Sequence, residues 1–339
     1  MQETLTHRYV QSNGIRMHMA EEGKGPLVVL LHGFPEMWYS WRHQLPAIAS
    51  AGYHAVAPDL RGYGETDAPP AVESYSLLTL TADVVGLLDA MQAETAVIVG
   101  HDWGAEIAWR CAQLYPQRIA AVGALSVPYS PRPMIPTQRM KQASGNVFNL
   151  ALYAQEPGVA EAELEADVRR TLRLFLYAYS GDAPPDLMPA LFTTRPAKAR
   201  ALDGMPEPTV LPAWLTKADL DSYTQAFVRT GFRGALSRLR SIDRDWRDWE
   251  ELARVGEPSV EQPVLFMGGE RDSAVRFGNL EGMKATLPKL RKVVLLPNCG
   301  HWVQQERAAE VNAELIDFLR EVFPPAIRVT RSRPAQPSR

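Results

Sequence analysis

Short apolar runs alternate with stretches of helical periodicity along most of this chain. Residues 26–31 form a continuous apolar run, and further strands are predicted at 54–58, 96–99 and 119–126. Such runs are typical of strands buried on both faces of a parallel sheet. Apolar residues recur along 77–91 at the spacing of one helix face, which predicts a helix between two of these strands. The repeated order of strand and helix predicts an α/β fold with a mostly parallel sheet flanked by helices.

Different patterns mark the two ends of the predicted core. Residues 6–21 alternate loosely between apolar and polar positions and contain Asn13-Gly14, a strong signal for a two-residue hairpin turn. An antiparallel ribbon is therefore expected at one edge of the sheet. The last two core strands are predicted at 264–267 and 293–296, and a closing amphipathic helix is predicted at 308–323.

Prolines interrupt the α/β pattern from Pro128 onward, and no further strand is predicted before residue 263. Helices are predicted within this interval at 161–179 and at 219–240, the second with a break at Gly231. A mainly helical insertion into the α/β core is therefore expected. The predicted boundaries are 1–128 and 251–323 for the core, 129–250 for the helical cap and 324–339 for a flexible tail rich in Pro and Arg.

Composition narrows the classes of function. The 339 residues carry a net charge of -3 without a long basic run outside the tail, which argues against nucleic-acid binding. Residues 1–13 lack the apolar segment of a signal peptide, and no apolar stretch is long enough to cross a membrane, so a cytoplasmic protein without a membrane partner is expected. Cys111 and Cys299 are far apart in sequence and are expected to be buried, unreactive thiols. We expect no cofactor and no metal, and both a monomer and a homodimer remain open.

The strongest chemical signal follows the predicted strand at 96–99. The chain reads Gly100-His101-Asp102-Trp103-Gly104, which places a carboxylate between two glycines where the strand is expected to turn sharply into a helix. This arrangement resembles the nucleophile elbow of α/β-hydrolases, with Asp where most such enzymes carry Ser. A carboxylate is already ionised at neutral pH, so Asp102 can attack an electrophilic sp3 carbon without the help of a base.

Two further reactive groups, Asp272 and His301, each follow one of the last two predicted strands. The order nucleophile, acid, histidine is the one that α/β-hydrolases use. Because reactive groups gather at the C-terminal ends of parallel strands, we expect Asp102, Asp272 and His301 to meet. Glu270 lies close enough in sequence to be the orienting acid instead of Asp272.

These groups predict hydrolysis in two steps. Asp102 first forms an ester with the substrate, and water activated by His301 then attacks the carbonyl of that ester. Backbone N–H groups of Trp103, directly after the nucleophile, and of Phe34, in the first loop, are expected to hold the oxyanion. Glu36 is expected to order that loop rather than to react.

Several motifs resemble those of the soluble and microbial epoxide hydrolases of the α/β-hydrolase superfamily. They are His32-Gly33-Phe34-Pro35-Glu36, Asp59-Leu60-Arg61-Gly62-Tyr63-Gly64, Gly100-His101-Asp102-Trp103-Gly104 and Cys299-Gly300-His301-Trp302 in the predicted core, and Gln155-Glu156-Pro157-Gly158-Val159-Ala160-Glu161 and Thr230-Gly231-Phe232-Arg233-Gly234 in the predicted cap. The resemblance runs from about residue 8 to about residue 320. It implies cofactor-free hydrolysis of a small hydrophobic epoxide, or of another electrophilic substrate, with an epoxide giving a vicinal diol. It also implies Asp102 as nucleophile, His301 as base and Asp272 as the partner of that base.

The sequence departs from this family at two cap positions. The family uses two cap tyrosines whose hydroxyls bind and protonate the epoxide oxygen, and the aligned positions here are Leu150 and Leu239. A positioned general acid typically contributes about 10²- to 10⁴-fold to the rate, so ring opening is expected to be impaired or altered. The substrate pocket is expected to include Leu150, Leu239, Trp38, Tyr153 and Trp302. Engineering and natural divergence both remain open as the origin of the two leucines.

Two other functions remain open. A haloalkane dehalogenase also attacks an sp3 carbon with Asp and needs no acid because halide leaves as an anion, and the indole N–H of Trp103 would suit that halide. A non-catalytic protein on the same scaffold would bind hydrophobic ligands in the cap pocket without turnover.

Overall fold

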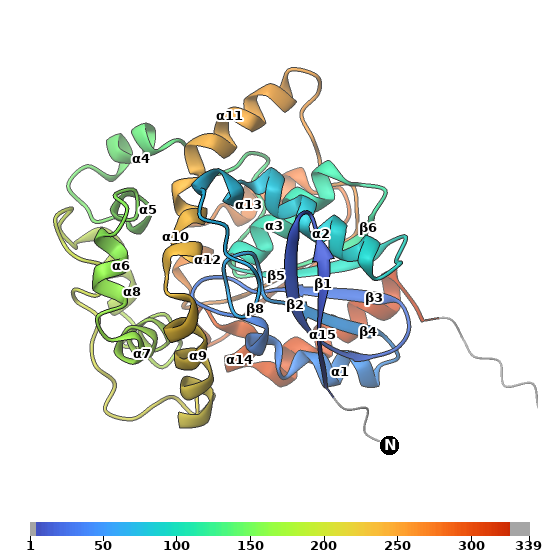
Figure 1. Cartoon of the computed structure of the whole chain (residues 1–339), viewed down its shortest axis with the longest axis horizontal. Coiled ribbons are helices and arrows are strands. Elements are labelled where there is room, and N and C mark those ends of the chain that lie inside the picture. The colour runs from blue at the N-terminus through green and yellow to red at the C-terminus, as the bar shows by residue number, and fades with distance from the viewer. Residues whose placement is uncertain (1–4, 326–339) are drawn as a thin grey trace, which may run out of the picture.

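A computed structural model describes residues 5–325 of the chain (Figure 1). The predicted fold class is confirmed by an eight-stranded sheet with the strand order β1-β2-β4-β3-β5-β6-β7-β8. The strands are β1 (Thr6–Ser12), β2 (Ile15–Gly23), β3 (Leu27–Leu31), β4 (His54–Pro58), β5 (Ala96–His101), β6 (Ile119–Leu125), β7 (Val264–Gly269) and β8 (Leu290–Leu296). β1 pairs with β2 and β2 with β4 in antiparallel register, whereas every other pair in the sheet is parallel.

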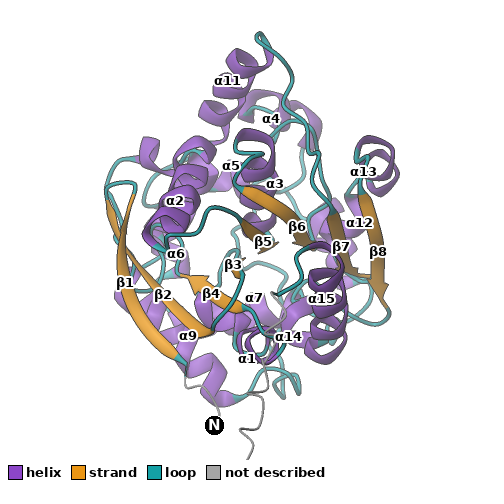
Figure 2. Cartoon of the chain, turned by 90° about the vertical axis from the view of Figure 1, so that its right-hand side faces the viewer, coloured by secondary structure: helices purple, strands orange, loops and turns teal. Residues whose placement is uncertain are grey.

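Helices cover both faces of the sheet (Figure 2). The core helices are η1 (Trp38–Trp41), α1 (Gln44–Ser50), η2 (Val72–Tyr75), α2 (Leu77–Ala90), α3 (Trp103–Leu114), α12 (Ser273–Phe277), α13 (Leu280–Thr286), α14 (Val303–Glu306) and α15 (Ala308–Val322). One apolar cluster joins the sheet to α1 and α15, for example through Ile48 and Leu315. A second cluster joins the other face to α2 and α3 through residues such as Leu87 and Ile107. The central strands are buried from both sides, as their continuous apolar sequences predicted.

Eight helices lie between β6 and β7 in the sequence and gather on one side of the core (Figure 1). They are α4 (Thr137–Ser144), α5 (Leu150–Tyr153), α6 (Val159–Leu164), α7 (Val168–Ala178), α8 (Leu187–Thr193), α9 (Lys217–Thr230), α10 (Arg233–Arg240) and α11 (Ile242–Ala253). We call this segment the cap. None of the helices within residues 5–325 is long and apolar enough to cross a membrane.

The cap differs from the sequence prediction at one helix boundary. One helix was predicted over 161–179, but the structure divides this segment into α6 and α7. Asp167 has a non-helical backbone, and its side chain accepts a hydrogen bond of 2.9 Å from the N–H of Arg170. It therefore acts as the N-cap of α7, so a new helix begins there. The break expected at Gly231 does occur, since Gly231 has a φ of +63° between α9 and α10.

Only the first two residues of the predicted tail belong to the described part of the chain. α15 ends at Val322, and these two residues are Pro324 and Pro325. The remainder of that prediction, residues 326–339, lies outside the described residues.

Candidate active site

Asp102 occupies a sharp turn between β5 and α3. Its backbone has a φ of +52°, a conformation that costs a non-glycine residue about 1–3 kcal/mol and persists only when the surroundings enforce it. The strand and the helix cross so closely that a Cβ on Gly100 would lie 2.1 Å from the carbonyl oxygen of Gly104. A Cβ on Gly104 would in turn lie 2.1 Å from the carbonyl oxygen of Leu31. The two glycines of the elbow motif are therefore required by this close packing.

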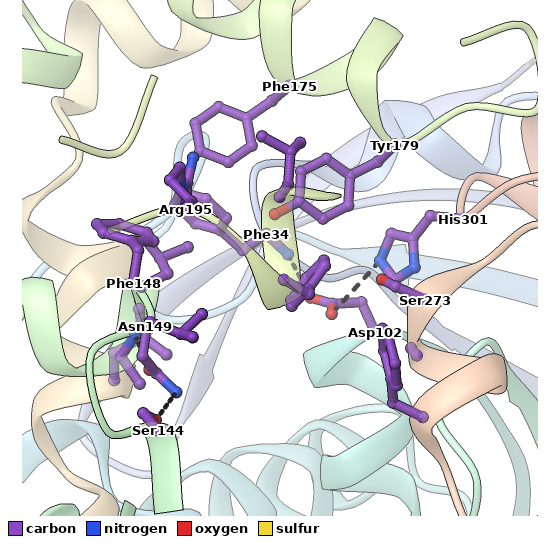
Figure 3. A pocket seen from close by; sticks show the side chains of 18 of the residues that line it. Phe34, Asp102, Ser144, Phe148, Asn149, Phe175, Tyr179, Arg195, Ser273 and His301 are labelled. Carbon is purple, nitrogen blue, oxygen red and sulfur yellow. Dashed lines mark hydrogen bonds and ion pairs between the residues drawn. The ribbon is translucent and has the colours of Figure 1, made fainter. Parts of the chain in front are cut away.

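The two carboxylate oxygens of Asp102 have different neighbours (Figure 3). The backbone N–H of Phe34 donates a hydrogen bond of 2.9 Å to Oδ1, while Oδ2 lies 3.5 Å from Nε2 of His301. A Cβ on Gly33 would lie 2.4 Å from Oδ1, so the loop can approach only because residue 33 is glycine. Of the two expected oxyanion donors, Phe34 makes this contact. Within the described residues, no hydrogen bond joins the N–H of Trp103 to this carboxylate.

His301 is fixed between two carboxylates. Its Nδ1 lies 3.1 Å and 3.0 Å from Oδ1 and Oδ2 of Asp272, whose side chain is fully buried. Its backbone N–H donates a 2.8 Å hydrogen bond to the carbonyl oxygen of Tyr179 at the end of α7. The structure therefore brings together Asp102, Asp272 and His301 from the ends of three strands. Glu270, the alternative acid, has an exposed side chain.

The charges in this cluster shift the pKa values of its members in opposite directions. Burial disfavours the imidazolium, but the charge of Asp272 and hydrogen bonds to Asp102 and Asp272 outweigh it and hold the pKa of His301 well above its usual value. Burial also disfavours the Asp102 carboxylate, yet the hydrogen bond and the charge of His301 hold the pKa of Asp102 below its usual value. Asp102 is consequently ionised at neutral pH, as a nucleophile must be.

A second buried pair, which the sequence interpretation missed, lies behind the first. Nε2 of His101 faces the carbonyl oxygen of His301 at 2.8 Å, and its Nδ1 faces Oε2 of Glu36 at 2.7 Å. Gln304 and Gln305 donate to Oε1 of Glu36, so the Glu36 carboxylate acts throughout as an acceptor. Both ring nitrogens of His101 therefore face oxygen atoms that can accept a hydrogen bond. The signal that could have identified this pair is the position of His101, directly before Asp102 in the elbow motif.

Glu36 also orders the first loop, which is the role that the sequence predicted for it. Its Oε2 accepts a 3.0 Å hydrogen bond from the N–H of Gly33, adjacent to the oxyanion donor Phe34. Burial opposes the charged form, but the nearby His101 charge and its hydrogen bond hold the pKa of Glu36 below its usual value. This fully buried pair therefore contacts both the loop that carries Phe34 and the backbone carbonyl of His301.

A cavity of about 770 Å³ opens between Asp102 and the cap (Figure 3). Leu150, Leu239 and Trp302, all expected in the substrate pocket, line it together with Asp102 and His301. Its wall is mainly apolar, as in most small-molecule sites. No group of three or more His, Cys, Asp or Glu side chains that could hold a metal ion occurs in residues 5–325.

Two residues expected in the pocket, Trp38 and Tyr153, are not among those that line the cavity. Trp38 lies in η1 and packs against the rings of His7 and Tyr39, with ring centroids 4.7 and 5.4 Å apart. The hydroxyl of Tyr153 donates a 2.7 Å hydrogen bond to Oε2 of Glu163, which draws it into contacts within the cap.

Tyr179 and Arg195 line the cavity but were not anticipated from the sequence. No sequence motif marks either residue. Tyr179 reaches the cavity through the docking of α7 on the loop that carries His301. The indole N–H of Trp302 donates a 2.8 Å hydrogen bond to the carbonyl oxygen of Leu176, which adds to this docking.

Comparisons with known proteins agree with this architecture. A family model described as the alpha/beta hydrolase fold matches residues 26–308. Epoxide hydrolase A of Mycobacterium tuberculosis is 45% identical to this chain over 318 residues, covering 93% of this chain and 97% of that protein. Epoxide hydrolase 3 of Siraitia grosvenorii is 40% identical over 328 residues, covering 94% and 99%. Among solved structures, epoxide hydrolase A from Mycobacterium thermoresistibile has a TM-score of 0.87 and 47% identity, covering 94% of this chain and 98% of that one.

Proposed function

This chain belongs to the α/β-hydrolase fold family and is an epoxide hydrolase-like enzyme within it, and from that premise we propose that it hydrolyses hydrophobic epoxides to vicinal diols through an ester on Asp102. One observation carries the proposal. Asp102 presents Oδ2 toward His301, while Oδ1 is already held by a backbone N–H of the first loop. The two oxygens are thus prepared for different roles.

In the first step, Oδ2 of Asp102 attacks a ring carbon of the epoxide. The attack forms an ester bond and breaks the carbon–oxygen bond of the ring, and it needs no base because the carboxylate is ionised. Oδ1 becomes the carbonyl oxygen of the ester and keeps its hydrogen bond to Phe34. The mainly apolar wall of the cavity favours an apolar substrate.

In the second step, His301 activates a water molecule that attacks the ester carbonyl. The developing oxyanion on Oδ1 is stabilised by the N–H of Phe34, which already points at that atom. Asp272 keeps Nδ1 of His301 protonated, so Nε2 is the nitrogen that accepts the proton from water. Formation of the ester removes one of the two negative charges beside His301, which lowers the pKa of the ring and favours its basic form.

Leu150 and Leu239 shape which epoxides react. Both line the cavity with Asp102, and neither can donate a hydrogen bond to the epoxide oxygen. We infer that these positions correspond to the two tyrosines of the family. Ring opening should then favour epoxides such as styrene oxide, whose benzylic carbon supports positive charge, over unactivated aliphatic epoxides.

The test measures the diol product and the ester adduct on the protein. The parent enzyme and His301→Gln are incubated with styrene oxide and with an aliphatic epoxide, and diol and intact protein mass are measured. The parent should release diol, whereas His301→Gln should accumulate an adduct of one substrate molecule on Asp102. In a single turnover in ¹⁸O-labelled water, the label should enter Asp102 rather than the diol. Absence of diol and adduct with every epoxide tried would refute the proposal, and bromide release from a bromoalkane would favour a dehalogenase.

A further inference from the structure

Ring opening in this cavity needs a hydrogen-bond donor on the cap. The carbon–oxygen bond of the epoxide must break on the side opposite the attacking Oδ2 of Asp102, so negative charge develops on an oxygen that points toward the cap. Leu150 and Leu239 offer that oxygen only carbon atoms. An oxyanion beside a mainly apolar wall is costly unless a donor is already in place.

Tyr179 places a hydroxyl in this part of the cavity. It follows the last residue of α7, and its carbonyl oxygen accepts the backbone N–H of His301 at 2.8 Å. Its ring packs against Phe175 and His301, with centroid distances of 5.9 and 6.0 Å. Figure 3 shows the hydroxyl turned toward the middle of the cavity, on the cap side of Asp102. The residue is therefore fixed relative to the reacting groups by both its backbone and its ring.

The Tyr179 ring contacts Phe175 and His301, but its hydroxyl has no hydrogen-bond partner within the described residues. The hydroxyls of Tyr153 and Tyr223 donate to Glu163 and Gln305, whereas that of Tyr53 is buried without a hydrogen-bond partner within the described residues. A hydroxyl that faces the catalytic cavity without a protein partner is free to bind a substrate oxygen.

Arg195 adds a positive charge beside Tyr179. Its guanidinium lies 3.8 Å from the centroid of the Phe148 ring, and one terminal nitrogen donates to the carbonyl oxygens of Ala201 and Asp203, both at 3.0 Å. Its Nε is buried and has no hydrogen-bond partner within residues 5–325. Burial raises the pKa of Tyr179, the Arg195 charge lowers it and the Asp102 charge raises it. The resulting pKa is about 12. Tyr179 is thus a protonated donor at neutral pH.

We propose that the hydroxyl of Tyr179 binds the epoxide oxygen and transfers its proton to it as Asp102 opens the ring. This proposal rests on the proposed epoxide hydrolase function. As the bond between Oδ2 and carbon forms, the ring carbon–oxygen bond breaks, and its oxygen takes the phenolic proton. Tyr179 is left as a phenolate beside the charge of Arg195. A proton from His301 restores the phenol, and the water consumed in the second step supplies two protons, one to the departing diol oxygen and one that returns to His301.

Three other hydroxyls line the cavity, namely Ser144, Thr193 and Ser273, and each is less suitable. An aliphatic hydroxyl is a much weaker acid than a phenol. Ser144 lies at the far end of the cavity from His301 (Figure 3), and its oxygen pairs with Nδ2 of Asn149. Thr193 is exposed, and its hydroxyl donates to the carbonyl oxygen of Pro189. Ser273 directly follows Asp272 at the start of α12 and belongs to the core rather than to the cap.

The experiment measures ester formation alone. In the His301→Gln background, the adduct on Asp102 is followed over time by intact mass spectrometry in excess styrene oxide. Adding Tyr179→Phe should slow adduct formation about 100-fold or more, the usual effect of removing one oxyanion donor. The matched control is Tyr177→Phe, on the same helix but outside the residues that line the cavity. This control should leave the rate of adduct formation unchanged.

The outcomes separate this proposal from the function on which it rests. If His301→Gln forms no adduct with any epoxide, the proposed function fails. If it forms the adduct and Tyr179→Phe changes the rate less than about threefold, far below the typical effect of an acid, Tyr179 is not the donor. Phe keeps the ring contacts and the backbone carbonyl, and the lost hydroxyl has no partner, so the thermal midpoint should be nearly unchanged. A Ser273→Ala variant with the larger loss would assign the donor to Ser273 and overturn the proposal.

Discussion

Replacement of Asp272 by Asn should slow hydrolysis of the Asp102 ester far more than its formation. Both oxygens of the buried Asp272 carboxylate lie within 3.1 Å of Nδ1 of His301. An asparagine amide can turn its NH₂ group toward this nitrogen. The ring would then carry its hydrogen on Nε2, which must instead accept a proton from water.

The magnitude follows from the roles of the two steps. Loss of a positioned general base costs about 10²- to 10⁴-fold, equivalent to about 3–5 kcal/mol on the barrier of ester hydrolysis. Ester formation depends on the ionised Asp102 and needs no base, so it should slow much less. The ester should therefore accumulate in Asp272→Asn during turnover, whereas the parent enzyme should hold less of it.

Rapid quenching followed by intact mass spectrometry measures both rates in one experiment. Glu270→Gln is the matched control, because Glu270 also follows β7 but has an exposed side chain. It should hydrolyse the ester as fast as the parent enzyme. Ester hydrolysis in Asp272→Asn that remains within about threefold of the parent, outside the range expected for a lost base, would refute the assigned role. An equal loss in Glu270→Gln would do the same.

Three further outcomes test other parts of the site. Glu36→Gln removes the buried carboxylate that faces His101 and should lower the unfolding free energy by about 3–5 kcal/mol in urea titrations, whereas Glu257→Gln, at an exposed surface ion pair, should change it little. Cys111 and Cys299 are buried, and burial raises the pKa of each thiol, so neither should react with a thiol reagent until the protein is denatured. The raised pKa of His301 stabilises the fold fully below pH 6.5, its unfolded value, and this stabilisation is lost as pH rises through the folded pKa. Urea titrations from pH 6 upward should therefore show the parent losing its advantage over His301→Gln; a constant difference would contradict this sign.

The sheet could be predicted from the sequence because its signals are local. Runs such as 26–31 are apolar without interruption, and the strands found there are buried on both faces. The meeting of Asp102, Asp272 and His301 follows from the same signals, since parallel strands bring their C-terminal ends to one edge. The elbow glycines identified the turn because only small residues permit its close packing.

The wall of the cavity was harder to predict because it depends on how the cap docks. Tyr153 was expected there, but a hydrogen bond to Glu163 holds its hydroxyl elsewhere. Tyr179 belongs to no motif, and its place is set by the carbonyl that receives the N–H of His301, a residue more than one hundred positions away. Helical periodicity reports which face of a helix is buried, but it does not report which cavity that face lines.

In the mechanism that we propose, charge links the two chemical steps into a cycle that returns every group to its starting state. In the free enzyme, His301 lies between the carboxylates of Asp102 and Asp272, which raise its pKa and favour its protonated form. Ester formation removes the charge of Asp102 and, with Tyr179 as the donor, creates a phenolate whose ring centroid lies 6.0 Å from that of His301. A proton passed from His301 to Tyr179 then neutralises both groups and leaves His301 as the base that the ester requires. Attack of water then recharges His301 and regenerates the Asp102 carboxylate, so His301 becomes basic only when there is an ester to hydrolyse.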